Sequence, residues 1–187
     1  MANFNLLNFQ GQILGGHGLA RTNRFEVAII PPPALSQYGG MVSILCEQAN
    51  LPMLNLGVKP FRIHNAPAYQ RPISIEYGGE GLSFTFHLDG DMLLKRFFDD
   101  WSHMIVDKNT YLVNYHENYA TSVFVSQLNE QDQVVYEVEF TEAFPRNLNL
   151  VQLDHTAQNQ TQRLVVMFNY RIWKDVQRTQ FIERSDP

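Results

Sequence analysis

The stretch "TQRLVVMFNYRIWKDVQ", residues 161–177, alternates large apolar side chains with polar ones and ends in an aromatic run. Successive side chains of a β-strand point to opposite faces of a sheet, so this alternation predicts a half-buried strand. We expect that strand to span residues 163–172. The stretch contains no obvious reactive group, which raises the question of what such a chain does.

Much of the remaining chain alternates in the same way, and several further strands are predicted. The glycine-rich residues 77–81 join two of these segments, which predicts a hairpin between them. The three prolines at 31–33 end the first strand, because proline cannot donate to a sheet ladder. The predicted strands are "RFEVAII" (24–30), "ISIEY" (73–77), "LSFTFHL" (82–88), "YLVNYH" (111–116), "TSVFVSQ" (121–127) and "VVYEVEF" (134–140).

One segment changes its period and predicts an α-helix over about residues 91–106. Asp89 or Asp91 can cap its first turn. Apolar residues recur there at spacings of three and four, which is typical of one buried helical face. The residues of this face are Leu94, Phe97, Phe98, Trp101, Met104 and Ile105.

Three segments are less regular. Residues 41–48 fit either a short helix or a strand, and residues 145–160 predict a loop. Residues 52–72 contain four prolines and predict mostly loop, with room for a short edge strand.

The sequence therefore predicts a mainly β protein: an antiparallel barrel or sandwich with one flanking helix. We expect three parts, an extended N-terminal arm (1–22), the β-domain (23–174) and a C-terminal tail (175–187).

Composition excludes several classes of function. The net charge is −5 and the basic residues are scattered, whereas a protein that grips DNA usually carries a basic patch. Cys46 is the sole cysteine, which excludes an internal disulfide and a thiolate zinc cluster and favours a reducing cytoplasm. Neither a secretory signal nor an apolar run of about 18 residues is visible.

Motifs for catalysis or metal binding are incomplete. "HENYA" at 116–120 starts like a zincin motif, but Ala120 stands where the second histidine is needed. "DGDM" starts like a calcium loop, but Leu93 and Lys95 replace later oxygen ligands, so helix capping is the better interpretation. Asp99 and Asp100 point about 100° apart on a helix and form a poor carboxylate pair. We therefore predict no enzyme activity, no cofactor and no metal.

The order of the segments resembles the tail tube proteins of contractile-tailed bacteriophages, from about Leu19 to Trp173. No single motif carries this resemblance; the combination does. Its segments are "LARTNRFEV", "CEQANLP", "RFFDDWSHMIVD", "YEVEFTEAFPRNLNLVQLDH" and "TQRLVVMFNYRIW".

The resemblance implies an antiparallel β-barrel with a flanking helix, six copies of which form a ring. Rings would stack into a hollow tube inside the tail sheath, through which DNA and the tape measure protein pass. The protein would then belong to the virion tail, be assembled in the host bacterial cytoplasm and contact the sheath and baseplate. Baseplate proteins that initiate the tube share the fold and form an alternative.

Within that frame, Glu137 and Glu139 are predicted to face the lumen, because an acidic wall does not hold phosphate. Phe4, Leu7, Phe9 and Ile13 of the N-terminal arm are predicted anchors on a neighbouring ring. A monomeric β-barrel that binds a small ligand is the alternative from another class. It predicts a closed apolar cavity, whereas a tube subunit predicts exposed apolar strands and self-association.

Overall fold

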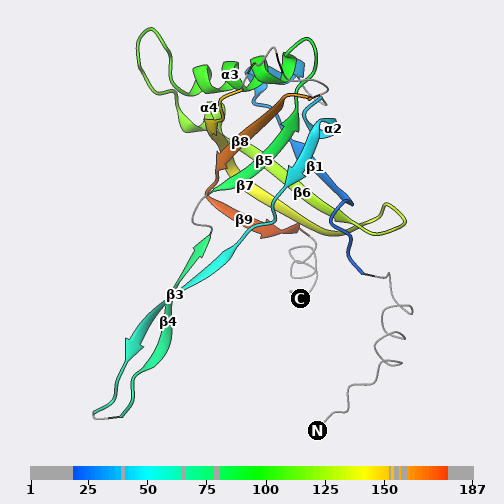
Figure 1. Cartoon of the computed structure of the whole chain (residues 1–187). Coiled ribbons are helices and arrows are strands. Elements are labelled where there is room, and N and C mark those ends of the chain that lie inside the picture. Colours follow the sequence, from blue (N-terminus) through cyan, green and yellow to red (C-terminus); the bar gives the residue numbers. More distant parts are fainter. Residues whose placement is uncertain are drawn as a thin grey trace, which may run out of the picture.

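The computed structural model describes residues 19–38, 41–64, 66–77, 81–151, 153, 156 and 160–176. These residues form a mainly β, antiparallel fold, which confirms the predicted fold class. A helix lies across one end of the strands, and a two-stranded hairpin extends from the opposite end (Figure 1).

Seven strands form the body, in the order β1-β6-β7-β8-β5-β2 with β9 on the free side of β7, and β3 pairs with β4 alone. All of these pairs are antiparallel. The strands span Phe25–Ile29 (β1), Cys46–Ala49 (β2), Leu54–Phe61 (β3), Tyr69–Tyr77 (β4), Leu82–His87 (β5), Thr121–Leu128 (β6), Val134–Leu148 (β7), Arg163–Asn169 (β8) and Ile172–Asp175 (β9).

The long strand β7 connects the two halves of the body. Its first half pairs with β6 and β9, and its second half pairs with β8. The register with β6 shifts where β7 carries an extra residue, and Glu142 there has a φ of 53°. A bulge of this kind bends a strand, so β7 can leave one sheet and enter the other.

Alternation along β1, β6 and β7 separates an apolar face from a polar one, as the sequence predicts. Val27, Val125 and Val138 are buried, and they lie next to one another in register. The residues between them point to the other face, because the side-chain period of a strand is two. This half of the fold therefore presents a mostly polar sheet face away from the core, on which Ala28 and Phe124 also lie.

The predicted helix is confirmed as α3, Leu93–Ile105. Leu94, Phe97, Phe98 and Trp101 are its buried residues, and Met104 and Ile105 pack partly against the core. The ring of Phe98 lies 5.5 Å from that of Phe86 on β5, and Trp101 lies 5.7 Å from Phe168 on β8. Aromatic side chains thus fill the end of the body that α3 covers.

The capping prediction is confirmed for Asp89. Its carboxylate accepts hydrogen bonds from the backbone N–H groups of Leu93 at 3.0 Å and Leu94 at 3.2 Å. Desolvation raises the pKa of Asp89, but these backbone donors outweigh it and leave the pKa below its ordinary value.

The prediction of a strand at residues 111–116 is wrong. Residues 106–115 form a loop with one isolated bridge, between Val106 and Val113. Asp107 starts a turn by accepting hydrogen bonds from the N–H groups of Asn109 and Thr110, both at 2.8 Å. Such a side-chain turn competes with the sheet ladder and wins here. A one-turn helix, α4 (His116–Tyr119), follows.

The prediction of a hairpin between residues 73–77 and 82–88 is also wrong. So is the prediction that residues 52–72 are mostly loop. β4 pairs with β3 instead, in a hairpin that reaches from Leu54 to Tyr77. β5 pairs with β8 and β2. Pro60 and Pro72 are accommodated because each strand of a two-stranded ribbon has one side without a partner.

The remaining segments are refined rather than overturned. Residues 41–48 contain both predicted alternatives, α2 (Met41–Ile44) followed by β2, after a 3₁₀ segment η1 (Pro33–Tyr38). The predicted loop at 145–160 begins later, because β7 continues to Leu148. The predicted final strand is divided into β8 and β9. The division into arm, domain and tail stays a prediction, since most of the arm and tail lie outside the described residues.

Candidate assembly interface

The β3–β4 hairpin exposes apolar side chains along a free-standing ribbon. Leu54 lies opposite Tyr77, and Leu56 lies opposite Ile75, so these four share one face. Leu56 and Ile75 are each 56% exposed. A two-stranded ribbon is only marginally stable alone in water, and clustered exposed apolar residues mark interaction sites. The face formed by Leu54, Leu56, Ile75 and Tyr77 is called the hairpin face below.

The distal part of the same hairpin combines aromatic and basic side chains. The rings of Phe61 and Tyr69 meet at 5.5 Å, and the Arg71 guanidinium lies 5.7 Å from the centre of the Phe61 ring. Residues 54–77 carry three basic residues and one acidic residue. The hairpin is therefore positive in a chain whose net charge is −5.

A second exposed apolar surface lies at the opposite end of the body, in the loop that follows α3 (Figure 1). Tyr111, Leu112, Val113 and Tyr115 are all exposed there, with Tyr115 at 84%. Residues 89–117 carry six acidic and three basic residues, so this end is negative. Residues 106–115 are called the apical loop below.

The predicted acidic residues Glu137 and Glu139 lie on the polar face of β7, as their spacing indicates. Glu137 accepts a hydrogen bond from Ser126 at 3.1 Å, and Glu139 accepts one from Ser122 at 2.8 Å. In register, Glu26 of β1 lies beside Ser126 and Lys174 of β9 lies beside Glu139. The polar sheet face is therefore acidic overall, with three carboxylates and one ammonium group.

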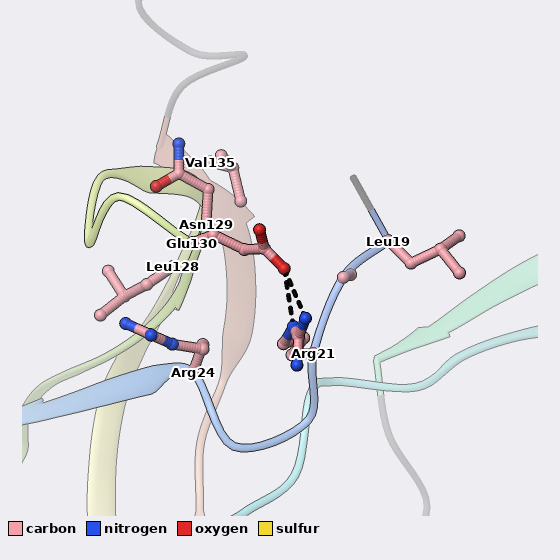
Figure 2. Close-up of a pocket in the computed structure, with 8 residues that line it drawn as sticks. Leu19, Arg21, Arg24, Leu128, Asn129, Glu130 and Val135 are labelled. Atoms are coloured by element: carbon pink, nitrogen blue, oxygen red, sulfur yellow. Dashed lines mark hydrogen bonds and ion pairs between the residues drawn. The ribbon is translucent and has the colours of Figure 1, made fainter. Parts of the chain in front are cut away.

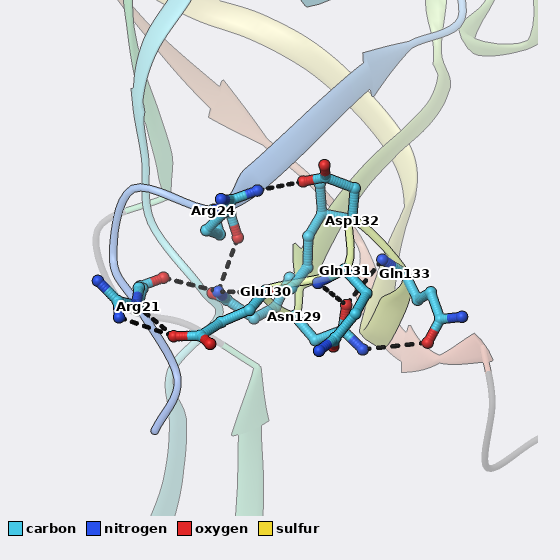
Figure 3. A network of polar contacts seen from close by, with 9 residues as sticks. Arg21, Arg24, Asn129, Glu130, Gln131, Asp132 and Gln133 are labelled. Atoms are coloured by element: carbon cyan, nitrogen blue, oxygen red, sulfur yellow. Dashed lines mark hydrogen bonds and ion pairs between the residues drawn. The ribbon is translucent and has the colours of Figure 1, made fainter. Parts of the chain in front are cut away.

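The root of the N-terminal arm, residues 19–24, is attached to the turn between β6 and β7 (Figure 3). The Gln127 side-chain amide donates to the carbonyl oxygens of Arg21 at 2.8 Å and Arg24 at 2.7 Å. Arg21 also forms an ion pair with Glu130 at 2.7 Å, and Arg24 forms one with Asp132. These contacts join segments that are more than 100 residues apart in the chain.

A hollow of about 230 Å³ lies between this arm root and the turn. Leu19, Leu128 and Val135 line it, and Figure 2 shows Leu128 and Val135 on one side of it and the paired Arg21 and Glu130 at its rim. The predicted arm anchors Phe4, Leu7, Phe9 and Ile13 lie outside the described residues, so nothing tests their role.

Sequence reasoning missed the hairpin face and the apical loop as surfaces. A signal for the hairpin was present, since Leu54, Leu56 and Val58 alternate, as do Ile73, Ile75 and Tyr77. The prolines within it concealed that signal. For the apical loop, the alternation of Tyr111, Val113 and Tyr115 predicts a strand, whereas the structure exposes these residues in a loop.

The described residues contain no group of three or more His, Cys, Asp or Glu side chains that could hold a metal ion. Over the same residues, no helix is long and apolar enough to cross a membrane. Burial raises the pKa of the Cys46 thiol to about 12, against a smaller opposing effect of its hydrogen bond to Gln48, so the thiol stays protonated at neutral pH.

An antiparallel β-body with a helix over one end and a projecting hairpin is a tail-tube-like fold. A model of the phage tail tube protein family matches residues 20–176. The chain therefore belongs to the phage tail tube protein family. No curated protein matches the sequence.

Solved structures with the same fold come from contractile injection systems. A chain of the anti-feeding prophage (AFP) baseplate, solved with six-fold symmetrisation, has a TM-score of 0.62 at 16% identity, over 84% of this chain and 95% of that chain. A chain of the AFP tube-terminating cap has a TM-score of 0.60 at 14% identity, over 84% of this chain and 90% of that chain. A chain of the PVC sheath–tube complex in the extended state has a TM-score of 0.52 at 15% identity, over 84% of this chain and 93% of that chain. At these identities the likeness shows the shared fold.

Proposed function

We propose that the protein is a structural subunit of a contractile tail, forming six-membered rings that stack into the inner tube. The observation that carries this proposal is the hairpin face, whose apolar residues are exposed along a ribbon that projects from the body. Such a surface is costly in water unless a partner covers it. The family match and the six-fold AFP structure support a ring of identical copies as that partner.

The two ends of the subunit favour head-to-tail stacking. The hairpin and the apical loop are different apolar surfaces at opposite ends, and their charges are of opposite sign. A contact between two different surfaces of identical copies repeats without limit unless the rotation closes it. Charge complementarity would set the polarity of the contact. This arrangement suits a tube that grows by the addition of rings.

The acidic sheet face suits the wall of a conduit. Glu26, Glu137 and Glu139 would face the lumen, where they repel phosphate and leave DNA free to pass. The tape measure protein would occupy the same lumen before ejection. The outer surface would contact the sheath, and the tube would start on the baseplate, in a tail assembled in the host cytoplasm.

The aromatic core argues against a ligand-binding barrel. Phe84, Phe86, Phe98, Trp101 and Phe168 are fully buried and in ring contact with one another. They occupy the interior that a ligand would need. The described hollow lies instead at the surface, beside the arm root.

A paired substitution in the hairpin face tests the proposal. Leu56→Asn with Ile75→Asn changes two exposed residues, so the subunit should stay folded. The loss of two buried apolar contacts per interface should raise the concentration for half-assembly at least about tenfold. Sedimentation and light scattering across a concentration series measure this shift.

The matched control is Asn55→Ser with Glu76→Asp, a directly opposed pair on the other face of the same ribbon that keeps the charge. It should assemble at nearly the wild-type concentration. Equal assembly by wild type and by the Leu56/Ile75 variant would refute the role of the hairpin face. Wild-type rings that elongate only after a second tube protein is added would favour the baseplate initiator over the main tube subunit.

A further inference from the structure

The hollow beside the arm root has the size and lining of an anchor pocket. Its volume of about 230 Å³ exceeds the roughly 150 Å³ of an apolar protein cavity that binds benzene. Leu128 and Val135 supply apolar walls, and the paired Arg21 and Glu130 lie at the rim (Figure 2). One phenylalanine or leucine side chain would fit.

The walls of this pocket are held in place before any occupant arrives. One wall is the arm root, and the other is the β6–β7 turn. The Gln127 amide and the two arginine–carboxylate pairs connect them. Within the turn, the Asn129 side chain accepts hydrogen bonds from the N–H groups of Gln131 and Gln133, both at 2.9 Å (Figure 3). A preformed pocket loses little conformational entropy on binding.

The sequence that precedes the pocket supplies a matching ligand. Residues 1–20 contain no Asp, Glu, Lys or Arg, whereas Phe4, Leu7, Phe9 and Ile13 are large and apolar. An uncharged segment with such side chains gains free energy by burying them. It also avoids placing a charge in an apolar pocket.

The length of this segment allows it to reach another copy. Eighteen residues precede Leu19, and an extended chain covers about 3.3 Å per residue, or roughly 60 Å in total. A body of this size is roughly 40 Å across. An extended arm can therefore reach beyond the body to which it is attached.

We propose that this pocket receives an apolar side chain from the N-terminal arm of an adjacent copy, so that the arms link the subunits of the tube. The inference rests on the proposed function and adds a contact separate from the hairpin face. The arm of a second copy is favoured over the subunit's own arm because the anchors extend over ten residues. One pocket accepts a single anchor, and the others need the surface of a neighbour.

A substitution in the pocket lining that fills the pocket tests whether an arm from another copy binds there. Ala20 lines the pocket and is exposed, so Ala20→Phe should occupy it without disturbing the core. We expect the concentration for half-assembly to rise at least about tenfold, with the thermal midpoint of the monomer unchanged. Ala34→Phe, at an exposed position in η1, is the matched control and should assemble as wild type does.

Deletion of residues 1–18 should raise the half-assembly concentration at least as much as Ala20→Phe does, and adding Ala20→Phe to the deletion should raise it no further. Changes that remove one and the same contact are non-additive. Additive effects, or normal assembly of Ala20→Phe, would overturn the proposal.

Cross-linking identifies which copy supplies the arm. In a Cys46→Ser background, copies carrying Gln10→Cys are mixed with tagged copies carrying Val135→Cys and treated with a short bis-maleimide. A cross-linked pair of the two masses is expected, and Ala34→Cys in place of Val135→Cys should give none. A further chain carries both Gln10→Cys and Val135→Cys. A link within that chain, with none between the mixed copies, would overturn the proposal, as would no link in either sample.

These experiments separate the inference from the proposed function. Tubes that form from wild type but are indifferent to Ala20→Phe and to the deletion would refute the arm contact alone. Wild type that never assembles would refute the tube function, and the mixed-copy cross-link would still report whether arms are exchanged.

Discussion

Single residues decide how the long elements begin and bend. Asp89 binds the first two N–H groups of α3, although Met92 next to the helix has a left-handed backbone with a φ of 56°. A carboxylate in this position accepts hydrogen bonds from N–H groups that have no partner within the helix. Its negative charge also interacts favourably with the positive end of the helix dipole. Glu142 has a similar left-handed backbone at the bulge of β7, and its carboxylate pairs with Arg171 at 2.7 Å.

Removal of the Asp89 carboxylate should weaken the start of α3. Asp89→Ala should lower the free energy of unfolding by about 1 kcal/mol at neutral pH, the usual contribution of a helix cap. Asp91→Ala is the matched control, because Asp91 is exposed and makes no described contact with the helix N–H groups. Urea unfolding of the three proteins measures the difference.

The pH dependence of this effect has a defined sign. The folded state holds the pKa of Asp89 below the ordinary value of about 3.9. The stabilisation is therefore complete above about pH 4 and is lost as the pH falls through the lower, folded-state pKa. The gap between wild type and Asp89→Ala should shrink in acid. A gap that is the same at pH 7 and in acid would contradict this account.

At the scale of elements, α3 was predictable because its signal is local. Its apolar residues recur with the helical period, and the same residues are buried in the structure. The Trp101 indole donates to the Tyr119 carbonyl at 2.9 Å, which fixes α4 against α3. One side chain thus joins the helix, the core and the following turn.

Truncation of Trp101 tests this role. Trp101→Ala leaves a large cavity among the core aromatics and an unpaired carbonyl, so the free energy of unfolding should fall by about 3–5 kcal/mol. Met104→Ala, on the same helix but only partly buried, should cost clearly less. Chemical denaturation gives both values, and equal losses would contradict the packing described.

The strands show where local signals stop. β1, β6 and the start of β7 followed from alternation, and so did the shared face of Glu137 and Glu139. The partner of β5 could not be predicted from alternation, because Leu82 pairs with Phe168, which lies far along the chain. Sequence neighbours usually pair, and this preference led to the wrong β4–β5 hairpin. Nothing in residues 82–88 alone distinguishes the two partners.

The β3–β4 hairpin was missed for a different physical reason. Prolines are rare inside sheets, so Pro60 and Pro72 argued for a loop. Both strands of a two-stranded ribbon are edge strands, where proline is tolerated, so the prolines do not prevent β3 and β4 from pairing. In the apical loop the error is the opposite one, because alternating apolar residues predict a strand where the structure has an exposed loop.

At the scale of the whole molecule, the arrangement of surfaces is what the sequence could not supply. Alternation gave two faces to each strand, but the strand order and the placement of α3 determine which face is covered. The structure places apolar surfaces at two opposite ends and an acidic sheet face on the body. That arrangement, together with membership of the tail tube family, is the basis of the proposed tube.

Electron cryomicroscopy of the concentrated protein tests the proposed tube. We predict hollow tubes of stacked six-membered rings, with Glu26, Glu137 and Glu139 on the inner wall and the hairpin of one ring against the apical loop of the next. Particles that stay monomeric at every concentration, or an assembly whose acidic sheet face lies on the outside, would contradict the account.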